Sequence, residues 1–264
     1  MKQLLQHLRT GVLELTDVPC PAPGKRQVLI QTRASLISAG TERMLVEFGQ
    51  GNLIQKARSQ PEKVRQVLDK MRTDGVMPTL EAVFRKLDEP LPLGYCNAGT
   101  VLAVGDRQTT DCGPQTTDLR LPTSDFAPGD RVVSNGPHAE IVCVPRNLCA
   151  RVPNGVTDEQ AAFTVLGSIA LQGVRLAVPT LGEQFMVFGM GLLGLMTVQL
   201  LRANGCAVLA IDVNRARLEL AKRFGAETVN LGAGGDPVVA AEAWTSGRGV
   251  DGAIITASAK NDSI

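Results

Sequence analysis

The chain has 264 residues, enough for two domains with separate hydrophobic cores, and a net charge of +1. The near-neutral charge and the aromatic content of 3% argue against a nucleic-acid surface, which needs basic residues and stacking rings. Its apolar runs are too short for a transmembrane helix, and the six cysteines form no C-x-x-C pair. We therefore expect a cytoplasmic protein with reduced thiols that binds a small-molecule substrate, and neither nucleic acid nor a membrane.

Residues 1–153 are expected to form a first domain of short strands and turns. Leu13 and Leu15 alternate with polar neighbours, residues 21–24 make a Pro-rich turn, and Val28–Thr32 is apolar, which predicts a β-hairpin. Further strands are expected within residues 93–105, 126–132 and 139–144. The polar residues 106–125 between them are predicted to form a surface loop.

A helical insertion is predicted at about residues 51–90. Pro61 and Pro78 lie near the starts of two helices, and Gly75 separates them. Apolar residues recur at helical spacing in each, namely Val64, Val67, Leu68 and Met71, and then Leu80, Val83, Phe84 and Leu87. Both helices are therefore expected to bury one face.

Residues 154–264 alternate helices with strands, which predicts a parallel sheet. A capping box at Thr157–Gln160 opens a helix that is expected to run to about Leu176. About four strands follow, at residues 184–188, 207–211, 228–230 and 253–256, with helices between them.

The glycines of this second part form a G-x-G-x-x-G motif between the first strand and its helix. Gly189 permits a tight turn, Gly191 lets a pyrophosphate approach the backbone, and Gly194 lets the helix pack closely on the strand. The helix starts at Leu192 and Leu193, where free N–H groups and the helix dipole favour phosphate. The motif predicts a dinucleotide site.

Asp212 ends the next strand, where an acid accepts hydrogen bonds from the adenosine ribose hydroxyls. A 2′-phosphate would meet this carboxylate, so the sequence favours NAD(H) over NADP(H). Arg215 lies close by in the sequence and weakens that preference. The alternative for the glycines alone is a turn in an ordinary βαβ unit.

Several further motifs lie along the chain, and with the glycine segment they resemble the medium-chain dehydrogenase/reductase superfamily. They are Leu93-Gly-Tyr95, Val104-Gly105, Gly129-Asp-Arg-Val132, Ala139-Glu140 and Ala161-Ala-Phe163. The segment Ile37-Ser-Ala-Gly-Thr-Glu42 and the helical insertion are similar to the bi-domain oxidoreductases of that superfamily. The resemblance implies an α/β fold: a GroES-like, partly open β-barrel domain at 1–153, then a Rossmann doubly wound parallel sheet at 154–264.

The resemblance also implies a C-terminal truncation, because relatives have further Rossmann strands. The resemblance is compatible with two kinds of partner: further copies of this chain in a homo-oligomer, or a fused or missing C-terminal oxidoreductase domain.

The family's catalytic zinc ligands are not matched in this sequence. The first Cys position falls on Ser38 and the His position on Tyr95, and no structural-zinc cluster of cysteines is present. We therefore expect no metal. The remaining arrangement, Cys96 with His138 and Glu42, has no precedent in its spacing.

Without a metal, hydroxyl groups must polarise the substrate. Tyr95 is the candidate hydrogen-bond donor to a developing alkoxide, and Ser38 and Thr41 are candidates to relay the proton. The alternatives are that Tyr95 fills the vacated metal pocket, that Ser38 and Thr41 cap a helix, and that His138 is a surface or structural residue.

The resemblance implies an NAD(H)-dependent, zinc-independent oxidoreductase that transfers hydride between the nicotinamide and a carbonyl or secondary alcohol, on a sugar or nucleotide-sugar. Two alternatives remain. One is a zinc-independent enone or quinone reductase that uses NADPH. The other is a non-catalytic cofactor-binding or scaffolding half of a larger oxidoreductase.

Overall fold

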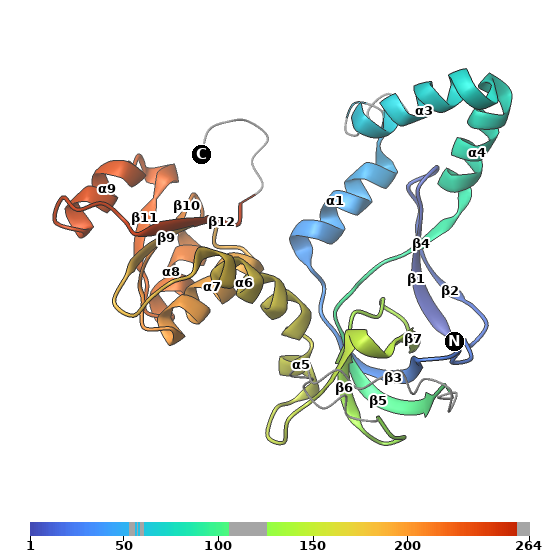
Figure 1. Ribbon diagram of the computed structural model, residues 1–264, viewed down its shortest axis with the longest axis horizontal. Coiled ribbons are helices and arrows are strands. Elements are labelled where there is room, and N and C mark those ends of the chain that lie inside the picture. Colours follow the sequence, from blue (N-terminus) through green and yellow to red (C-terminus); the bar gives the residue numbers. More distant parts are fainter. Residues whose placement is uncertain (53–55, 57, 59–60, 106–125, 258–264) are drawn as a thin grey trace, which may run out of the picture. The chain divides into compact units, whose positions relative to one another are not determined.

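The computed structural model describes the chain except for residues 53–55, 57, 59–60, 106–125 and 258–264. It divides into two compact units, Met1–Phe163 and Thr164–Ile264 (Figure 1). The surface loop predicted at 106–125 lies outside the described residues. In the part of the chain that is described, no helix is both long enough and apolar enough to cross a bilayer.

The first unit is built on two antiparallel sheets, with strand orders β2-β1-β4 and β7-β3-β5-β6-β8. Alternate residues of β3, Val28 and Ile30, are fully buried and pack with Val142 and Val144 of β7. The strands are β1 (Lys2–His7), β2 (Leu13–Asp17), β3 (Gln27–Ser35), β4 (Pro90–Pro92), β5 (Asn97–Val104), β6 (Arg131–Ser134), β7 (Ile141–Pro145) and β8 (Cys149–Arg151). A short 3-10 helix, η1 (Arg146–Leu148), joins the last two.

The two strands of the predicted hairpin do not pair with each other. β2 pairs with β1, whereas Val28–Thr32 lies within β3, which pairs with β5 and β7. The alternation of Leu13 and Leu15 does not mark a core face, since these side chains are 42% and 64% exposed. A strand can be recognised from its local pattern, but its partner is set by residues far away in the sequence.

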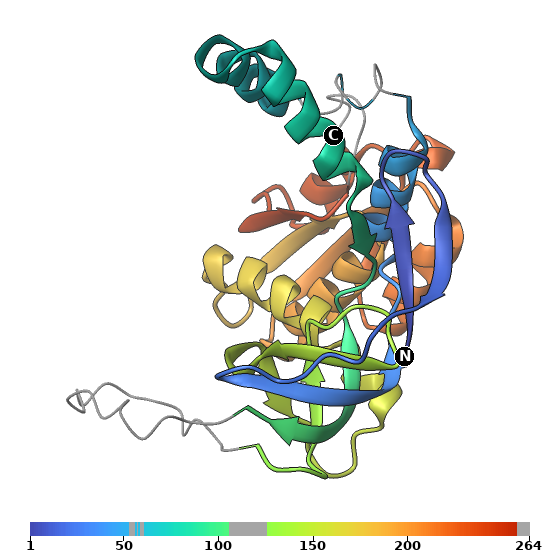
Figure 2. The same ribbon diagram turned by 90° about the vertical axis from the view of Figure 1, so that its right-hand side faces the viewer.

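Among the described residues between β3 and β4, the helices are α1 (Ala39–Gln50), α3 (Pro61–Asp74) and α4 (Val76–Asp88). The two predicted helices are present as α3 and α4, which lie against each other (Figures 1 and 2). Gly75 separates them with a φ of +91°, a left-handed conformation that favours glycine. The described part of the helical insertion therefore forms a helix pair, as the sequence predicted.

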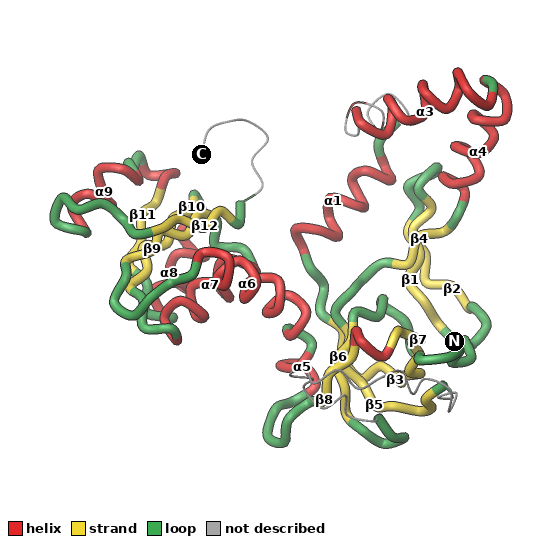
Figure 3. The backbone as a smooth tube through the Cα atoms, in the orientation of Figure 1, coloured by secondary structure: helices red, strands yellow, loops and turns green. Residues whose placement is uncertain are grey.

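The second unit is a parallel sheet of order β11-β10-β9-β12 with helices between the strands (Figure 3). Its elements are α6 (Thr164–Ala177), β9 (Gln184–Phe188), α7 (Leu192–Ala203), β10 (Ala207–Asp212), α8 (Arg215–Arg223), β11 (Glu227–Asn230), η2 (Leu231–Ala233), α9 (Pro237–Trp244) and β12 (Gly252–Ile255). The antiparallel first unit and this parallel sheet confirm the predicted α/β fold class.

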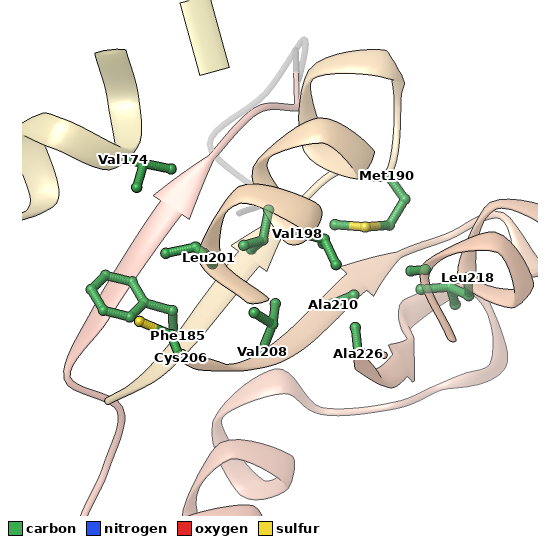
Figure 4. Packing of buried hydrophobic residues seen from close by; sticks show 12 residues of the cluster. Val174, Phe185, Met190, Val198, Leu201, Cys206, Val208, Ala210, Leu218 and Ala226 are labelled. Atoms are coloured by element: carbon green, nitrogen blue, oxygen red, sulfur yellow. The ribbon is translucent and has the colours of Figure 1, made fainter. Parts of the chain in front are cut away.

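Both faces of this sheet are covered by helices. Phe185 of β9 packs with Val198 and Leu201 of α7 (Figure 4). Val187 of β9 belongs to the same cluster. The intervening residues of β9 and β10 point to the opposite face, where α9 packs. Because successive side chains of a strand alternate between faces, an apolar run such as residues 184–188 is required when both faces are buried.

The helix predicted from residue 157 to about 176 is two helices. The capping box is present, with Thr157 Oγ1 accepting from the Gln160 N–H, but α5 (Asp158–Ala161) ends at once and α6 begins at Thr164. A turn at Ala162 and Phe163 separates them. Helix α5 contacts β3 and β5, so it belongs to the first unit, and the chain passes between the units after Phe163 rather than at residue 153.

Leu201→Ala is expected to lower the free energy of unfolding of the second unit by about 2–5 kcal/mol, because a fully buried side chain leaves a cavity in the core. Leu181→Ala is the control, since Leu181 is 84% exposed, and its effect should stay within about 0.5 kcal/mol. Urea unfolding followed by fluorescence of Trp244, the single tryptophan, reports on this unit. Equal effects of the two substitutions would contradict the assignment of the core.

Candidate functional site

The glycine turn after β9 depends on Gly189. Its φ is +88°, and a Cβ there would lie 2.8 Å from the backbone nitrogen and from Cβ of Ala257. The Thr256 hydroxyl donates to the carbonyl oxygens of Phe188 and Gly189 at 2.9 and 2.7 Å. The end of β12 therefore fixes the turn, and only glycine has room at its first position.

Gly194 sets how closely α7 approaches this turn. A Cβ at Gly194 would lie 1.8 Å from the Gly189 carbonyl oxygen, a distance that no side chain can occupy. The absence of a side chain thus lets the first turn of α7 rest directly on the backbone that leaves β9. This is the close packing that the sequence predicted for this glycine.

Gly191 faces open space. It has an ordinary φ of −75°, and a Cβ there would meet nothing within 4 Å. It is the N-cap of α7 but makes no side-chain cap bond, and Leu195 donates the first backbone bond to its carbonyl. The N–H groups of Leu192, Leu193 and Gly194 precede that bond, and such groups, together with the helix dipole, attract anions. The position has room for a phosphate to approach the backbone.

Asp212 lies at the carboxyl end of β10 and is 7% exposed. One carboxylate oxygen accepts the Met190 N–H at 2.6 Å, and the other accepts the Asn214 N–H at 2.7 Å. A carboxylate has about four acceptor positions, so capacity remains for two ligand hydroxyls. Asp212 therefore fits the role of a ribose-binding acid and also ties the glycine turn to β10.

The cation beside Asp212 is Arg217. Its Nη1 lies 3.9 Å from Asp212 Oδ2, whereas Arg215, which the sequence pointed to, is the first residue of α8. Asn214 caps this helix through the N–H groups of Ala216 and Arg217. Sequence distance alone could not choose between the two arginines, because the direction of a helical side chain follows the start of the helix.

In the first unit, the structure brings Tyr95 and Thr41 together. The Tyr95 hydroxyl donates to Thr41 Oγ1 over 3.3 Å. Ser38 is buried at the N-cap of α1, but its side chain makes no cap bond; instead its backbone N–H donates to Glu42 Oε1 at 2.8 Å. A phenol and a hydroxyl in contact can polarise a substrate oxygen together.

His138 is a functional candidate that the sequence treated as a surface or structural residue. Its Nε2 lies 2.9 Å from Glu42 Oε2 and its Nδ1 lies 2.9 Å from Ser35 Oγ. The His138 and Glu42 side chains are 11% and 8% exposed. The sequence placed His138 and Glu42 together only as candidate zinc ligands with Cys96, and no spacing rule predicts their hydrogen bond, because 96 positions separate them in the chain.

Among the described residues, no three His, Cys, Asp or Glu side chains gather as a metal would require. Of the arrangement Cys96, His138 and Glu42, the structure joins His138 to Glu42, and both ring nitrogens of His138 are engaged. Ser38 and Tyr95, at the family's ligand positions, offer hydroxyl groups that zinc sites rarely use.

Comparison with known proteins gives a consistent picture. Residues 193–263 match the family model described as zinc-binding dehydrogenase. The chain is 27% identical to the probable D-xylulose reductase A of Aspergillus terreus over 158 residues, which cover 53% of this chain and 45% of that protein. It is 26% identical to the sorbitol dehydrogenase of Homo sapiens over 237 residues, covering 83% and 57%. The chain thus spans about half the length of these relatives.

A solved structure extends the likeness over nearly the whole chain. The alcohol dehydrogenase TADH from Thermus sp. ATN1 superposes with a TM-score of 0.70, covering 98% of this chain and 71% of that one. At 19% sequence identity this similarity concerns the fold.

Gly194→Ala and Gly191→Ala are expected to differ sharply in stability. Gly194→Ala forces a Cβ against the Gly189 carbonyl and should lower the free energy of unfolding by about 1–3 kcal/mol or more. Gly191→Ala adds a methyl group to open space at an ordinary φ and should change it by less than about 0.5 kcal/mol. Urea unfolding curves of the two variants measure this, and equal stabilities would refute the close contact.

Proposed function

We propose that this chain is an oxidoreductase of the medium-chain dehydrogenase/reductase superfamily and that it uses a nicotinamide dinucleotide to interconvert a carbonyl group and a secondary alcohol. The matches to a zinc-binding dehydrogenase model, to a sorbitol dehydrogenase and to a probable D-xylulose reductase support this proposal. The observation that supports this most is the glycine turn, in which Gly191 leaves the start of α7 open beside a buried acid, Asp212. When bound, the dinucleotide supplies or accepts the hydride, and the residues of the chain orient it and move the proton.

The same site favours NAD(H). The N–H groups at the start of α7 would bind the pyrophosphate, and Asp212 would accept both ribose hydroxyls. A 2′-phosphate would lie against the Asp212 carboxylate and be repelled. Arg217, 3.9 Å from Asp212, offsets part of that repulsion and would contact the ribose from the side of α8.

The proposed chemistry is zinc-independent and rests on hydroxyl groups. Because Tyr95 donates to Thr41, the Thr41 hydroxyl keeps its own proton to donate to a substrate oxygen. The two groups would stabilise charge on that oxygen as the carbonyl is reduced, with Ser38 in the same helix start. This pair would perform the polarising role that zinc has in metal-dependent enzymes.

The proposed substrates are polyols and the matching ketoses. The support is the similarity to proteins named sorbitol dehydrogenase and D-xylulose reductase. Ketoses are sugars, so these substrates agree with the sugar substrates that the resemblance implies. D-xylulose and D-sorbitol are therefore the probes with which to start.

Titration with NADH and NADPH, followed by nucleotide fluorescence, tests the cofactor. We expect NADH to bind more tightly, and Gly191→Val to abolish binding because its side chain would occupy the space of the pyrophosphate. Gly173→Val in α6 is the control, since a Cβ there also meets nothing within 4 Å. Unchanged NADH affinity in a folded Gly191→Val protein would refute the site, and tighter NADPH binding would favour the enone or quinone reductase alternative.

Tyr95→Phe is expected to lower kcat for D-xylulose reduction by up to about 100-fold, because it removes the hydroxyl that polarises Thr41, the proposed donor to the developing oxyanion. Ser38→Ala should lower kcat too, and NADH affinity should stay the same in both variants. Zinc content is measured on the same samples by elemental analysis. Full activity of both variants would refute the proposed roles of Tyr95 and Ser38, and one zinc per chain would overturn the metal-free chemistry. A folded wild type that binds NADH without turnover would favour the scaffolding alternative.

A further inference from the structure

Three polar side chains from separate parts of the first unit meet at His138. Ring Nδ1 lies 2.9 Å from the Oγ of Ser35, the last residue of β3, and Nε2 lies 2.9 Å from Glu42 Oε2 in α1. The second Glu42 oxygen accepts the Ser38 N–H at 2.8 Å. The result is a continuous chain of hydrogen bonds from α1 to the end of β3.

The imidazole is fixed by its surroundings. The His138 N–H donates to the Leu93 carbonyl at 2.7 Å, and the His138 carbonyl accepts the Leu4 N–H at 2.9 Å. The ring also lies against Gly94, where a Cβ would be 2.6 Å from ring atoms Cγ and Cδ2. His138 is therefore an oriented imidazole with two defined partners, and not a mobile surface side chain.

The partners determine where the ring carries its proton. A carboxylate only accepts hydrogen bonds, so Glu42 requires a proton on Nε2. In the neutral ring, Nδ1 then accepts from the Ser35 hydroxyl, and in the charged ring Nδ1–H donates to the same oxygen. The Ser35–His138 bond persists in both states and only its direction reverses, which is what a proton relay requires.

The two ends of this chain of hydrogen bonds differ in how exposed they are to solvent. Glu42 is 8% exposed, and both of its oxygens are already engaged, by His138 and by the Ser38 N–H. Ser35 is exposed, so its hydroxyl can meet a substrate or solvent. Glu42 is thus the closed end of this chain of hydrogen bonds, and Ser35 is the open end.

We propose that Ser35, His138 and Glu42 form a proton relay for the carbonyl–alcohol interconversion; this inference rests on the proposed function. In reduction, the substrate carbon gains the hydride from the dinucleotide and its oxygen takes the Ser35 proton. Ser35 Oγ then takes the proton from His138 Nδ1, which leaves a neutral imidazole. Alcohol oxidation reverses each transfer, and Glu42 stays charged throughout. His138 and Glu42 are positioning residues, because they act through Ser35.

The tautomer of His138 tests the relay without any substrate. The sequence has two histidines, so nitrogen-15 spectra of histidine-labelled protein contain only His7 and His138, and His7→Gln assigns them. We expect the neutral His138 ring to carry its proton on Nε2 in the wild type, and Glu42→Gln to weaken that preference, because an amide also offers a donor. A wild-type ring protonated on Nδ1 would overturn the relay.

Kinetics with D-xylulose and saturating NADH test whether the relay moves the proton during turnover. His138→Gln should lower kcat by about 100-fold and remove one ionisation from the kcat–pH profile, while the NADH Kd stays unchanged. Ser35→Ala and Glu42→Gln should lower kcat as well. His7→Gln is the matched control, because His7 pairs with Glu14 at 2.8 Å, away from this chain of hydrogen bonds.

The outcomes separate the relay from the proposed function. If the wild type turns over and His138→Gln keeps kcat within about threefold with the same pH profile, the relay is wrong and the proposed function stands. If the folded wild type binds NADH but turns over neither D-xylulose nor D-sorbitol, the proposed reaction fails and the relay's task fails with it. Stoichiometric zinc that is lost in His138→Gln would make His138 a metal ligand and overturn the relay.

Discussion

The backbone contact between Gly194 and Gly189 is the constraint on which the second unit depends. It brings the first turn of α7 onto the turn that leaves β9, where any Cβ would collide with a carbonyl oxygen. With that distance fixed, α7 begins directly after Gly191, where a Cβ would meet nothing within 4 Å. The glycines are therefore not interchangeable: one forms the turn, one forms the contact and one leaves room for a ligand.

Asp212 connects this contact to the rest of the sheet. Its carboxylate accepts the N–H of Met190, within the glycine turn, and of Asn214, at the cap of α8. Asp212, the proposed acceptor for a ligand, thus also connects the ends of β9 and β10 through hydrogen bonds. Removing its charge would affect the turn and the ribose position together, so loss of binding after substitution of Asp212 would not separate the two roles.

The first unit brings hydroxyl, imidazole and carboxylate groups together near the start of α1. Tyr95 contacts Thr41, and Glu42, the next residue in α1, contacts His138. In the proposed function, polarisation of the substrate and movement of the proton are tasks of separate groups. Zinc-based enzymes combine both tasks in the metal and its ligands, whereas hydroxyl groups need a separate base to return the proton.

The sequence by itself determined the second unit almost completely, because its strands, helices and glycine motif are local patterns with known geometry. It also determined the helices around Gly75, where φ must be positive. Only the tertiary structure decided that β3 pairs with β5 and β7, and that Arg217 approaches Asp212. The sequence named His138 and Glu42 together only as candidate zinc ligands, and the tertiary structure showed their hydrogen bond. Contacts between residues distant in the chain depend on how sheets and helices pack, and local periodicity contains no information about that packing.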